Sequence, residues 1–227
     1  MTLKCLSTGS TANCYILTHE GKHLILDMGI PVPEIKKGMD FDIGNVVGAL
    51  CTHCHKDHSL SVEKLKKMGI PVWQPYLSEH KRQRTRIGDF QIECFDVPHN
   101  GTENRGFLIT MGGTTFLYCT DYEYIPYDLS KRNINVMLLE MNYQKHRIND
   151  NSHLTHVVLG HAEEQTTIGV IQQNLKCLRA VILCHMSNSG GLDRELAMQH
   201  IREIVPEYIS INWAKAGESY DISECPF

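Results

Sequence analysis

Short apolar segments separated by glycine, proline and asparagine run through the whole chain, and most of them have the length of β-strands. Gly21 lies between the second and third of these segments, as expected for a hairpin turn. The first half of the chain is therefore rich in predicted strands, at residues 3–6, 14–18, 23–27, 46–52, 90–97, 106–110 and 114–120.

The second half of the chain alternates predicted strands with predicted helices. Strands are predicted at residues 134–140 and 179–184, and helices at residues 162–175 and 192–204. One earlier segment, residues 59–68, also has helical spacing, and Gly69 ends it. Many strands with a few helices predict a core of two sheets covered by helices on its outer faces.

Three histidines and one aspartate follow the predicted strand at residues 46–52, as His53, His55, Asp57 and His58. Imidazole and carboxylate are ligands for divalent metals, and imidazole suits zinc. Residues i and i+2 at a strand end point the same way, so we expect His53 and His55 to bind one ion together. Asp57 and His58 follow where the chain turns and are expected to face a second ion. Two adjacent ions are typical of a hydrolytic site.

Further ligands are expected at the ends of other apolar segments. His99 follows the strand predicted at residues 90–97, Asp121 follows residues 114–120, and His185 follows residues 179–184. Strand ends are rigid and converge at one edge of a sheet, which makes them the expected place for a site.

Composition limits the class of protein. At 227 residues with 42% hydrophobic residues, the chain is expected to form one domain, residues 1–227, with a substantial core. No segment approaches the ~20 apolar residues that span a bilayer, and the first residues lack the pattern of a signal peptide. Nine cysteines without regular spacing favour reduced thiols and a cytoplasmic protein. The net charge of −4 argues against global attraction to nucleic acid, although bound dications can supply positive charge locally.

These motifs resemble the metallo-β-lactamase superfamily over nearly the whole chain. Residues 26–29, Leu-Asp-Met-Gly, are similar to the Asp-x-Gly that precedes the metal loop of the family. The four residues from His53 to His58 and the later candidate ligands fall in the order of the family's motifs. The resemblance implies an α+β fold, a four-layer αββα sandwich with the metals at one edge of the two sheets.

Within the superfamily, the chain resembles the YycJ/WalJ-like branch, near RNase Z. Residues 9–14 (Gly-Ser-Thr-Ala-Asn-Cys), 97–100 (Val-Pro-His-Asn) and 184–187 (Cys-His-Met-Ser) carry this resemblance. It implies phosphodiester hydrolysis and, in this branch, often nuclease activity. Asn100 stands where the branch commonly has Asp, and Tyr122-Glu123 stand in place of Thr-Gly, so the substrate stays open.

The pattern together with the resemblance predicts two divalent ions, zinc or manganese. The first is expected on His53, His55 and His99, the second on Asp57, His58 and His185, with Asp121 bridging both. Asp57 is predicted to be a catalytic residue as well as a ligand. The hydroxide shared by the ions is expected to attack phosphorus in line. The alternative, a structural zinc on Cys51 and Cys54, lacks a second pair of cysteines at this spacing.

The resemblance also predicts residues beyond the ligands. His161 resembles the catalytic histidine that protonates the leaving group, and Glu140 resembles its partner carboxylate. His153 is the competing candidate for this acid. Asp27 is expected to accept a hydrogen bond from a metal-binding histidine and so fix its tautomer.

Two other features bear on the substrate. Residues 80–86 carry four cations, which is usual for a solvated face but would also follow the phosphates of an entering substrate. Tyr122, Tyr124 and Tyr127 are candidates for stacking on a base, with a lid or an interface as the alternative.

The sequence thus predicts a dinuclear metal-dependent phosphodiesterase, a nuclease acting on DNA or RNA. The alternative is hydrolysis of a cyclic nucleotide or another small phosphodiester. A thioester or lactone hydrolase is less favoured because Pro98-His99-Asn100 lacks the Gly-His-Thr of that chemistry. A metal-binding module without activity is the last alternative. Partners are expected to be nucleic acid or nucleotide, with no membrane, and the resemblance allows a homodimer.

Overall fold

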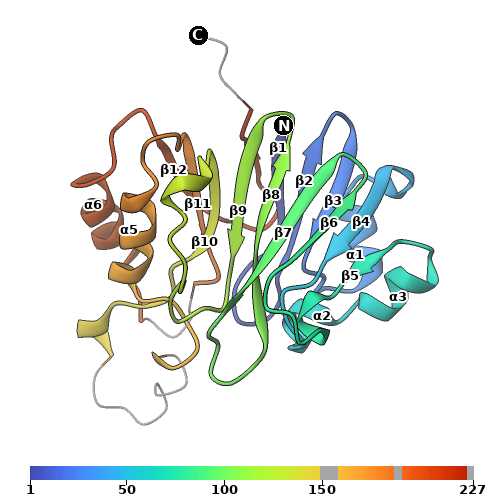
Figure 1. Ribbon diagram of the computed structural model, residues 1–227, viewed down its shortest axis with the longest axis horizontal. Helices are drawn as coiled ribbons and strands as arrows, with labels where there is room; N and C mark the ends of the chain where they lie inside the picture. Colours follow the sequence, from blue (N-terminus) through green and yellow to red (C-terminus); the bar gives the residue numbers. More distant parts are fainter. Residues whose placement is uncertain (149–157, 187–190, 224–227) are drawn as a thin grey trace.

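Two β-sheets packed face to face form the centre of the computed structural model, which describes residues 1–148, 158–186 and 191–223 (Figure 1). The first sheet has six strands in the order β13-β1-β2-β3-β4-β5. Their bounds are Thr2–Ser7 for β1, Cys14–His19 for β2, Lys22–Leu26 for β3, Val46–Leu50 for β4, Val72–Trp73 for β5 and Ser219–Asp221 for β13.

The second sheet has seven strands in the order β12-β11-β10-β9-β8-β7-β6. Strands β9 to β12 pair in parallel, and β6 to β9 pair antiparallel. The bounds are Gln83–Ile87 for β6, Phe90–Val97 for β7, Asn104–Met111 for β8, Thr114–Cys119 for β9, Val136–Glu140 for β10, Ala180–Cys184 for β11 and Ser210–Trp213 for β12.

Helices lie on the outer faces of both sheets (Figure 1). The first sheet is covered by α1 (Val32–Gly38) and α3 (Val62–Lys67), and α5 (Glu164–Gln173) and α6 (Arg194–Arg202) pack on the second. The short helices are α2 at Lys56–Ser59, η1 at Ile43–Asn45, η2 at Pro75–Leu77, η3 at Ser130–Arg132 and η4 at Lys145–Arg147. The expected four-layer αββα sandwich is confirmed.

The burial pattern explains these layers. Along β7, Phe90 and Ile92 point into the core between the sheets, whereas Phe95 and Val97 point to the outer side. Every residue of β10 and β11 is buried, as continuous apolar runs are in parallel strands covered on both faces. Among the described residues, no helix is long and apolar enough to cross a bilayer, and the eight cysteines are all free.

The helix predicted at residues 59–68 is wrong in its bounds. The structure has α2 and α3 there, separated at Leu60 and Ser61. The Ser61 amide donates to Met28 O and its hydroxyl to Ile30 O, so the turn is held by the loop after β3. These tertiary hydrogen bonds outweigh local helical spacing, and they fix α2, which carries Asp57 and His58.

The segment at residues 80–86, for which the sequence indicates a solvated face, belongs in part to a β-strand. It contains most of β6, an edge strand whose residues Gln83 to Ile87 pair in register with β7. In the part of the chain that the structure describes, α5 and α6 cover the β10–β12 half of the second sheet but leave β6 and β7 without a helix (Figure 1).

Candidate metal centre

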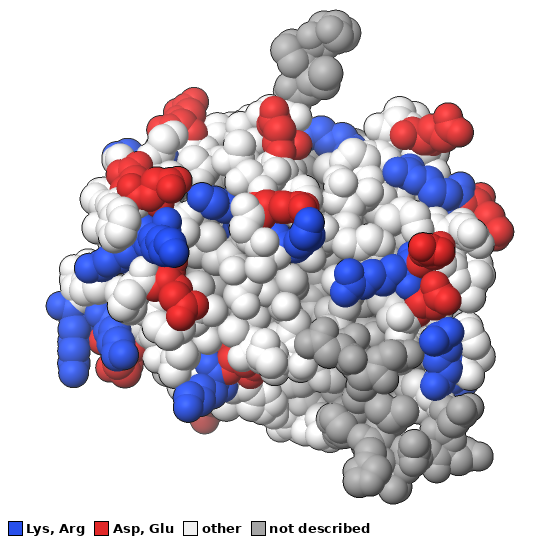
Figure 2. Space-filling model, turned by 180° about the vertical axis from the view of Figure 1, so that it is seen from behind, with Lys and Arg blue, Asp and Glu red and all other residues white. Residues whose placement is uncertain are grey.

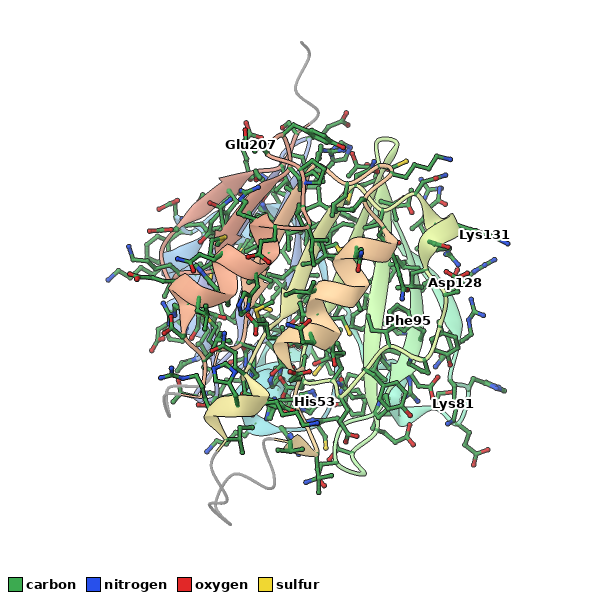
Figure 3. The ribbon with its side chains drawn as sticks, turned by 90° about the vertical axis from the view of Figure 1, so that its left-hand side faces the viewer. His53, Lys81, Phe95, Asp128, Lys131 and Glu207 are labelled. Atoms are coloured by element: carbon green, nitrogen blue, oxygen red, sulfur yellow. The ribbon has the colours of Figure 1, made fainter. Side chains whose placement is uncertain are left out.

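The seven predicted ligands meet at one end of the two sheets, where Figure 3 labels His53. Four of them lie in the segment after β4, which includes α2, and one each lies just after β7, β9 and β11. Their donor atoms form two groups, each within 4.8 Å. The groups are His53, His55, His99 and Asp121, and Asp57, His58, Asp121 and His185.

Ring nitrogens converge in the first group. His55 Nδ1 lies 3.0 Å from His53 Nε2 and 3.2 Å from His99 Nε2. His99 Nδ1 donates to the carbonyl of Gly160 at 2.6 Å, so its Nε2 presents a lone pair. Burial lowers the pKa of both His53 and His99, which keeps these rings neutral. Neutral rings with converging nitrogens are suited to a shared cation.

The Asp121 carboxylate connects the two groups. Its Oδ2 lies 3.2 Å from His58 Nε2 and 3.4 Å from His53 Nε2, and its Oδ1 lies 3.0 Å from His185 Nε2. Burial raises the pKa of Asp121, but His185 and His58 outweigh this and hold it well below its usual range. An ionised carboxylate between two sets of imidazoles has the position that a bridging ligand needs.

The donor set fits divalent cations. The Nδ1 of His185 lies 3.0 Å from Glu140 Oε1, and its buried Nε2 has no hydrogen bond of good geometry, although Asp121 Oδ1 is 3.0 Å away. Because Glu140 holds Nδ1, Nε2 is the nitrogen that faces the centre. Cys51 does not compete, because its thiol donates to the carbonyl of His53, and Cys54 is exposed. Nitrogen and oxygen donors of this kind are those of zinc or manganese.

Asp27 lies fully buried behind the second group. His58 Nδ1 donates to Asp27 Oδ2 at 2.7 Å, which leaves His58 Nε2 facing the centre. The Thr52 amide and hydroxyl and the Tyr118 hydroxyl also donate to this carboxylate, Tyr118 at 2.6 Å. Thr52 and Tyr118 were not predicted: Thr52 adjoins His53, but no local signal indicates Tyr118, 91 residues from Asp27.

Three residues of the centre have a left-handed backbone. The φ angles of Asp27, Asp121 and His185 are 52°, 54° and 52°. This conformation is uncommon for residues other than glycine and tends to occur at functional sites, where the surrounding structure enforces it. Each lies within two residues of the end of a strand, so the turn aims the side chain across the sheet edge.

Glu140 holds two histidines at once. This carboxylate is fully buried, and its Oε1 lies 2.7 Å from His161 Nδ1 and 3.0 Å from His185 Nδ1. Its other oxygen accepts the Tyr122 amide. The sequence paired Glu140 with His161 alone, and the contact with His185 shows that it also orients a predicted ligand.

His161 lies beside the centre. With Ser10 and Asn100, it lines a cavity of about 280 Å³ above the ligands. Burial lowers the pKa of His161, but Glu140 more than offsets this and holds the pKa above its usual value. His161 lies three residues before α5 begins at Glu164. The competing candidate, His153, lies outside the described residues.

The aromatic residues after Asp121 differ in exposure. Tyr122 is fully buried against Glu140 and Thr167, so its predicted role in base stacking is wrong. The Tyr127 hydroxyl donates to Asp96. Tyr124 is 53% exposed and keeps the stacking role as a prediction.

Comparison with known proteins supports the architecture. The family model described as "Metallo-beta-lactamase superfamily" matches residues 7–131. The exodeoxyribonuclease YycJ of Bacillus anthracis is 21% identical over 252 residues, which cover 96% of this chain and 93% of the relative. Among solved structures, YhfI from Bacillus subtilis, a metallo-beta-lactamase fold protein, has a TM-score of 0.73 at 15% identity and covers 96% of this chain and 98% of its own. The short form of human tRNase Z has a TM-score of 0.65 at 14% identity and covers 98% and 100%.

Proposed function

The chain belongs to the metallo-beta-lactamase superfamily, and we propose that within it the protein is a dinuclear metal-dependent phosphodiesterase that acts on nucleic acid. The observation that carries this proposal is the combination of two ligand groups sharing Asp121 with a separate histidine–carboxylate pair beside them. The 21% identity to a protein named exodeoxyribonuclease supports the substrate class.

His53, His55, His99 and Asp121 would hold one ion, and Asp57, His58, Asp121 and His185 the other. When bound, such ions lower the pKa of water and neutralise phosphoryl oxygens. The surrounding residues favour binding of these two ions. Asp27 holds Nδ1 of His58 and Glu140 holds Nδ1 of His185, so the Nε2 atom of each ring faces the centre.

We assign to His161 the protonation of the leaving oxygen. Glu140 accepts from its Nδ1, so Nε2 is the atom that holds a proton for transfer. Glu140 is buried and bonded on both oxygens, which fixes the ring beside the cavity above the ligands. Phosphodiester cleavage needs this proton because the departing alkoxide is a poor leaving group.

Hydrolysis assays test this proposal. The metal-loaded protein is expected to hydrolyse bis-p-nitrophenyl phosphate, and His53→Ala to abolish this activity and lower the metal content. His146→Ala is the matched control, because His146 is exposed and belongs to η4. Loss of hydrolysis in both variants, or in neither, would contradict the assignment of the centre.

A single-stranded oligonucleotide and a cyclic nucleotide assayed side by side test the substrate class. Cleavage of the oligonucleotide is expected. Turnover of the cyclic nucleotide alone would replace nucleic acid with a small phosphodiester, and hydrolysis of a lactone or thioester alone would overturn the proposal.

A further inference from the structure

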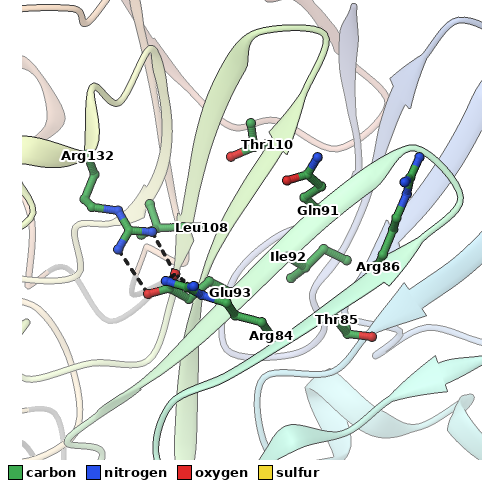
Figure 4. Close-up of a pocket in the computed structure, with 9 residues that line it drawn as sticks. All are labelled: Arg84, Thr85, Arg86, Gln91, Ile92, Glu93, Leu108, Thr110 and Arg132. Carbon is green, nitrogen blue, oxygen red and sulfur yellow. Dashed lines mark hydrogen bonds and ion pairs between the residues drawn. The ribbon is translucent and has the colours of Figure 1, made fainter.

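A groove of about 580 Å³ lies on the outer face of the second sheet, where no helix of the described residues covers β6 and β7 (Figure 4). Arg84 and Arg86 project from β6 opposite Glu93 and Gln91 of β7, with which they pair in register. Arg132 of η3 closes the other side. We call this feature the arginine groove, defined by Arg82, Arg84, Arg86, Arg132 and Glu93.

The arginine groove keeps a positive charge after its own ion pairs are counted. Glu93 accepts from three guanidinium groups, Arg82 at 2.8 Å, Arg84 at 2.9 Å and Arg132 at 2.9 and 3.0 Å. Arg86 pairs with Asp89 at 3.6 Å. Two carboxylates balance only two of the four arginine charges. The side chains of Arg84 and Arg86 are 78% and 68% exposed, so they can reach a ligand.

The positive charge of the arginine groove is opposite in sign to the net charge of the chain. The chain as a whole carries a net charge of −4. On the opposite face, acidic and basic side chains are interspersed, as Figure 2 shows. Positive charge at the arginine groove is therefore a local feature, and its complement is a polyanion.

The arginine groove continues toward the metal centre. The Arg82 guanidinium lies over the Tyr127 ring, 5.4 Å from its centroid. The preceding residue, Lys81, lines a second cavity of about 360 Å³ together with Tyr124 and His99. His99 also lines the cavity above the ligands. In Figure 3, Lys81 lies at the same height as His53, whereas Lys131 lies above Lys81 on the right of the view.

We propose that the arginine groove binds the phosphate backbone of a single-stranded nucleic acid whose reacting end lies at the metal centre. This inference rests on the proposed function and narrows it to polymeric substrates, because a small phosphodiester held at the ligands would not extend to β6. Tyr124, exposed between the two sites, is positioned to stack on an unpaired base.

Binding measurements test the arginine groove separately from catalysis. The metal-loaded full-length protein is titrated into a fluorescent phosphorothioate oligonucleotide, which resists cleavage, at several salt concentrations. Each phosphate contact contributes roughly 0.7 to the slope of log affinity against log salt for single strands. The double variant Arg84→Gln/Arg86→Gln should flatten this slope by about 1.4, and it leaves Arg82 and Arg132 on Glu93 to preserve the fold.

The matched control is Lys64→Gln/Lys67→Gln, which removes the same charge from exposed positions on α3. It is expected to keep the wild-type slope. Equal slopes in all three proteins would overturn the proposal, and so would equal flattening in both variants, which would reflect net charge alone. Tyr124→Ala should weaken binding roughly tenfold at an unchanged slope.

The two proposals fail differently. If the salt slope flattens in the arginine variant but the wild-type protein hydrolyses no phosphodiester, the proposed function is contradicted and the proposed binding role of the arginine groove is supported. If the wild-type protein hydrolyses a phosphodiester but the salt slope is unchanged in the arginine variant, the binding role of the groove is contradicted and the proposed function is supported.

Discussion

At the scale of single residues, Asp27 connects the metal centre to the core between the sheets. Its carboxylate accepts one hydrogen bond from His58 in the metal centre and another from Tyr118 in the second sheet. Asp27→Asn removes the charge that fixes the His58 tautomer, so metal affinity is expected to fall about 10–100-fold. Competition with a chromogenic chelator measures this change.

Asp42→Asn is the control for Asp27, because Asp42 also faces a histidine, His23 at 3.1 Å, but at the surface. We expect wild-type metal affinity for it. An Asp27→Asn protein with the same affinity as Asp42→Asn would show that the Asp27 contact does not act on the ligands.

His161→Ala is expected to keep its metal and lose about 10²–10⁴-fold in rate on substrates with poor leaving groups. The loss should be much smaller for p-nitrophenyl esters, whose leaving group departs without a proton. The comparison is kcat for the two substrate types, with metal content measured in parallel.

His200→Ala provides a matched pair, since His200 also contacts a glutamate, Glu164 at 2.9 Å, on the helical side. Its rate should equal that of the wild type. Full activity of His161→Ala on a nucleic acid substrate would remove the acid role.

The sequence predicted the ligand residues but not the contacts behind them. Seven ligands were predictable because each lies shortly after a strand, and four of them fall within six residues of sequence. The second partner of Glu140 and the hydroxyl of Tyr118 arise from packing between segments far apart in the chain. Exposure also depends on such packing, which is why Tyr122 was wrongly predicted to be available for stacking.

At the scale of elements, the loop between β3 and α1 packs tightly on the metal loop. A Cβ atom at Gly29 would lie 1.7 Å from Asp57 O and 2.9 Å from Asn13 N. Gly29→Ala must therefore displace the backbone that carries Asp57, and we expect about 1–3 kcal/mol lower free energy of unfolding together with weaker metal binding. Denaturant unfolding and metal titration measure the two effects.

Gly169→Ala in α5 is the control, because nothing lies within 4 Å of the added methyl group. A helical Gly-to-Ala change is expected to be neutral or to stabilise by up to about 1 kcal/mol. If Gly29→Ala behaved like Gly169→Ala, the close contact between the two loops would be unimportant.

The pairing of β6 with β7 predicts a dependence of stability on pH. Hydrogen bonds from Arg132 and the other two arginines, which outweigh the effect of burial, hold the pKa of Glu93 at about 2. A pKa lower in the folded than in the unfolded state stabilises the fold above the unfolded value, and this contribution is lost as pH falls toward 2. Glu93→Gln should therefore flatten the fall in unfolding free energy between about pH 4.5 and 2.

Denaturant midpoints across this pH range make the comparison, with Glu203→Gln, an exposed glutamate after α6, as the control. A Glu93→Gln curve as steep as that of the wild type would show that the three arginines do not stabilise the folded state through this carboxylate.

Elements buried on both faces were the most predictable. The apolar runs at β10 and β11 indicate strands directly, because every residue in them is buried. The helix at residues 59–68 was misplaced because Ser61 bonds to the loop after β3. Strand β6 was missed because an edge strand needs only alternate burial, and its polar residues matched a solvated face.

At the scale of the whole molecule, the two sheets close around one core, and the site lies at an edge that both sheets share. Tyr118 of the second sheet bonds to Asp27 of the first, so sheet packing and ligand geometry depend on each other. The fold and family predicted from the sequence are confirmed. The single domain, the homodimer and the cytoplasmic location stay predictions.

The content of divalent metal in the purified full-length protein tests the central claim most directly. Elemental analysis after purification without chelators should give about two ions per chain, because the two ligand groups share Asp121 and each fits one cation. His53→Ala and His185→Ala should each lower this content. Fewer than about one ion per chain in the wild-type protein, or unchanged content in both variants, would contradict the account.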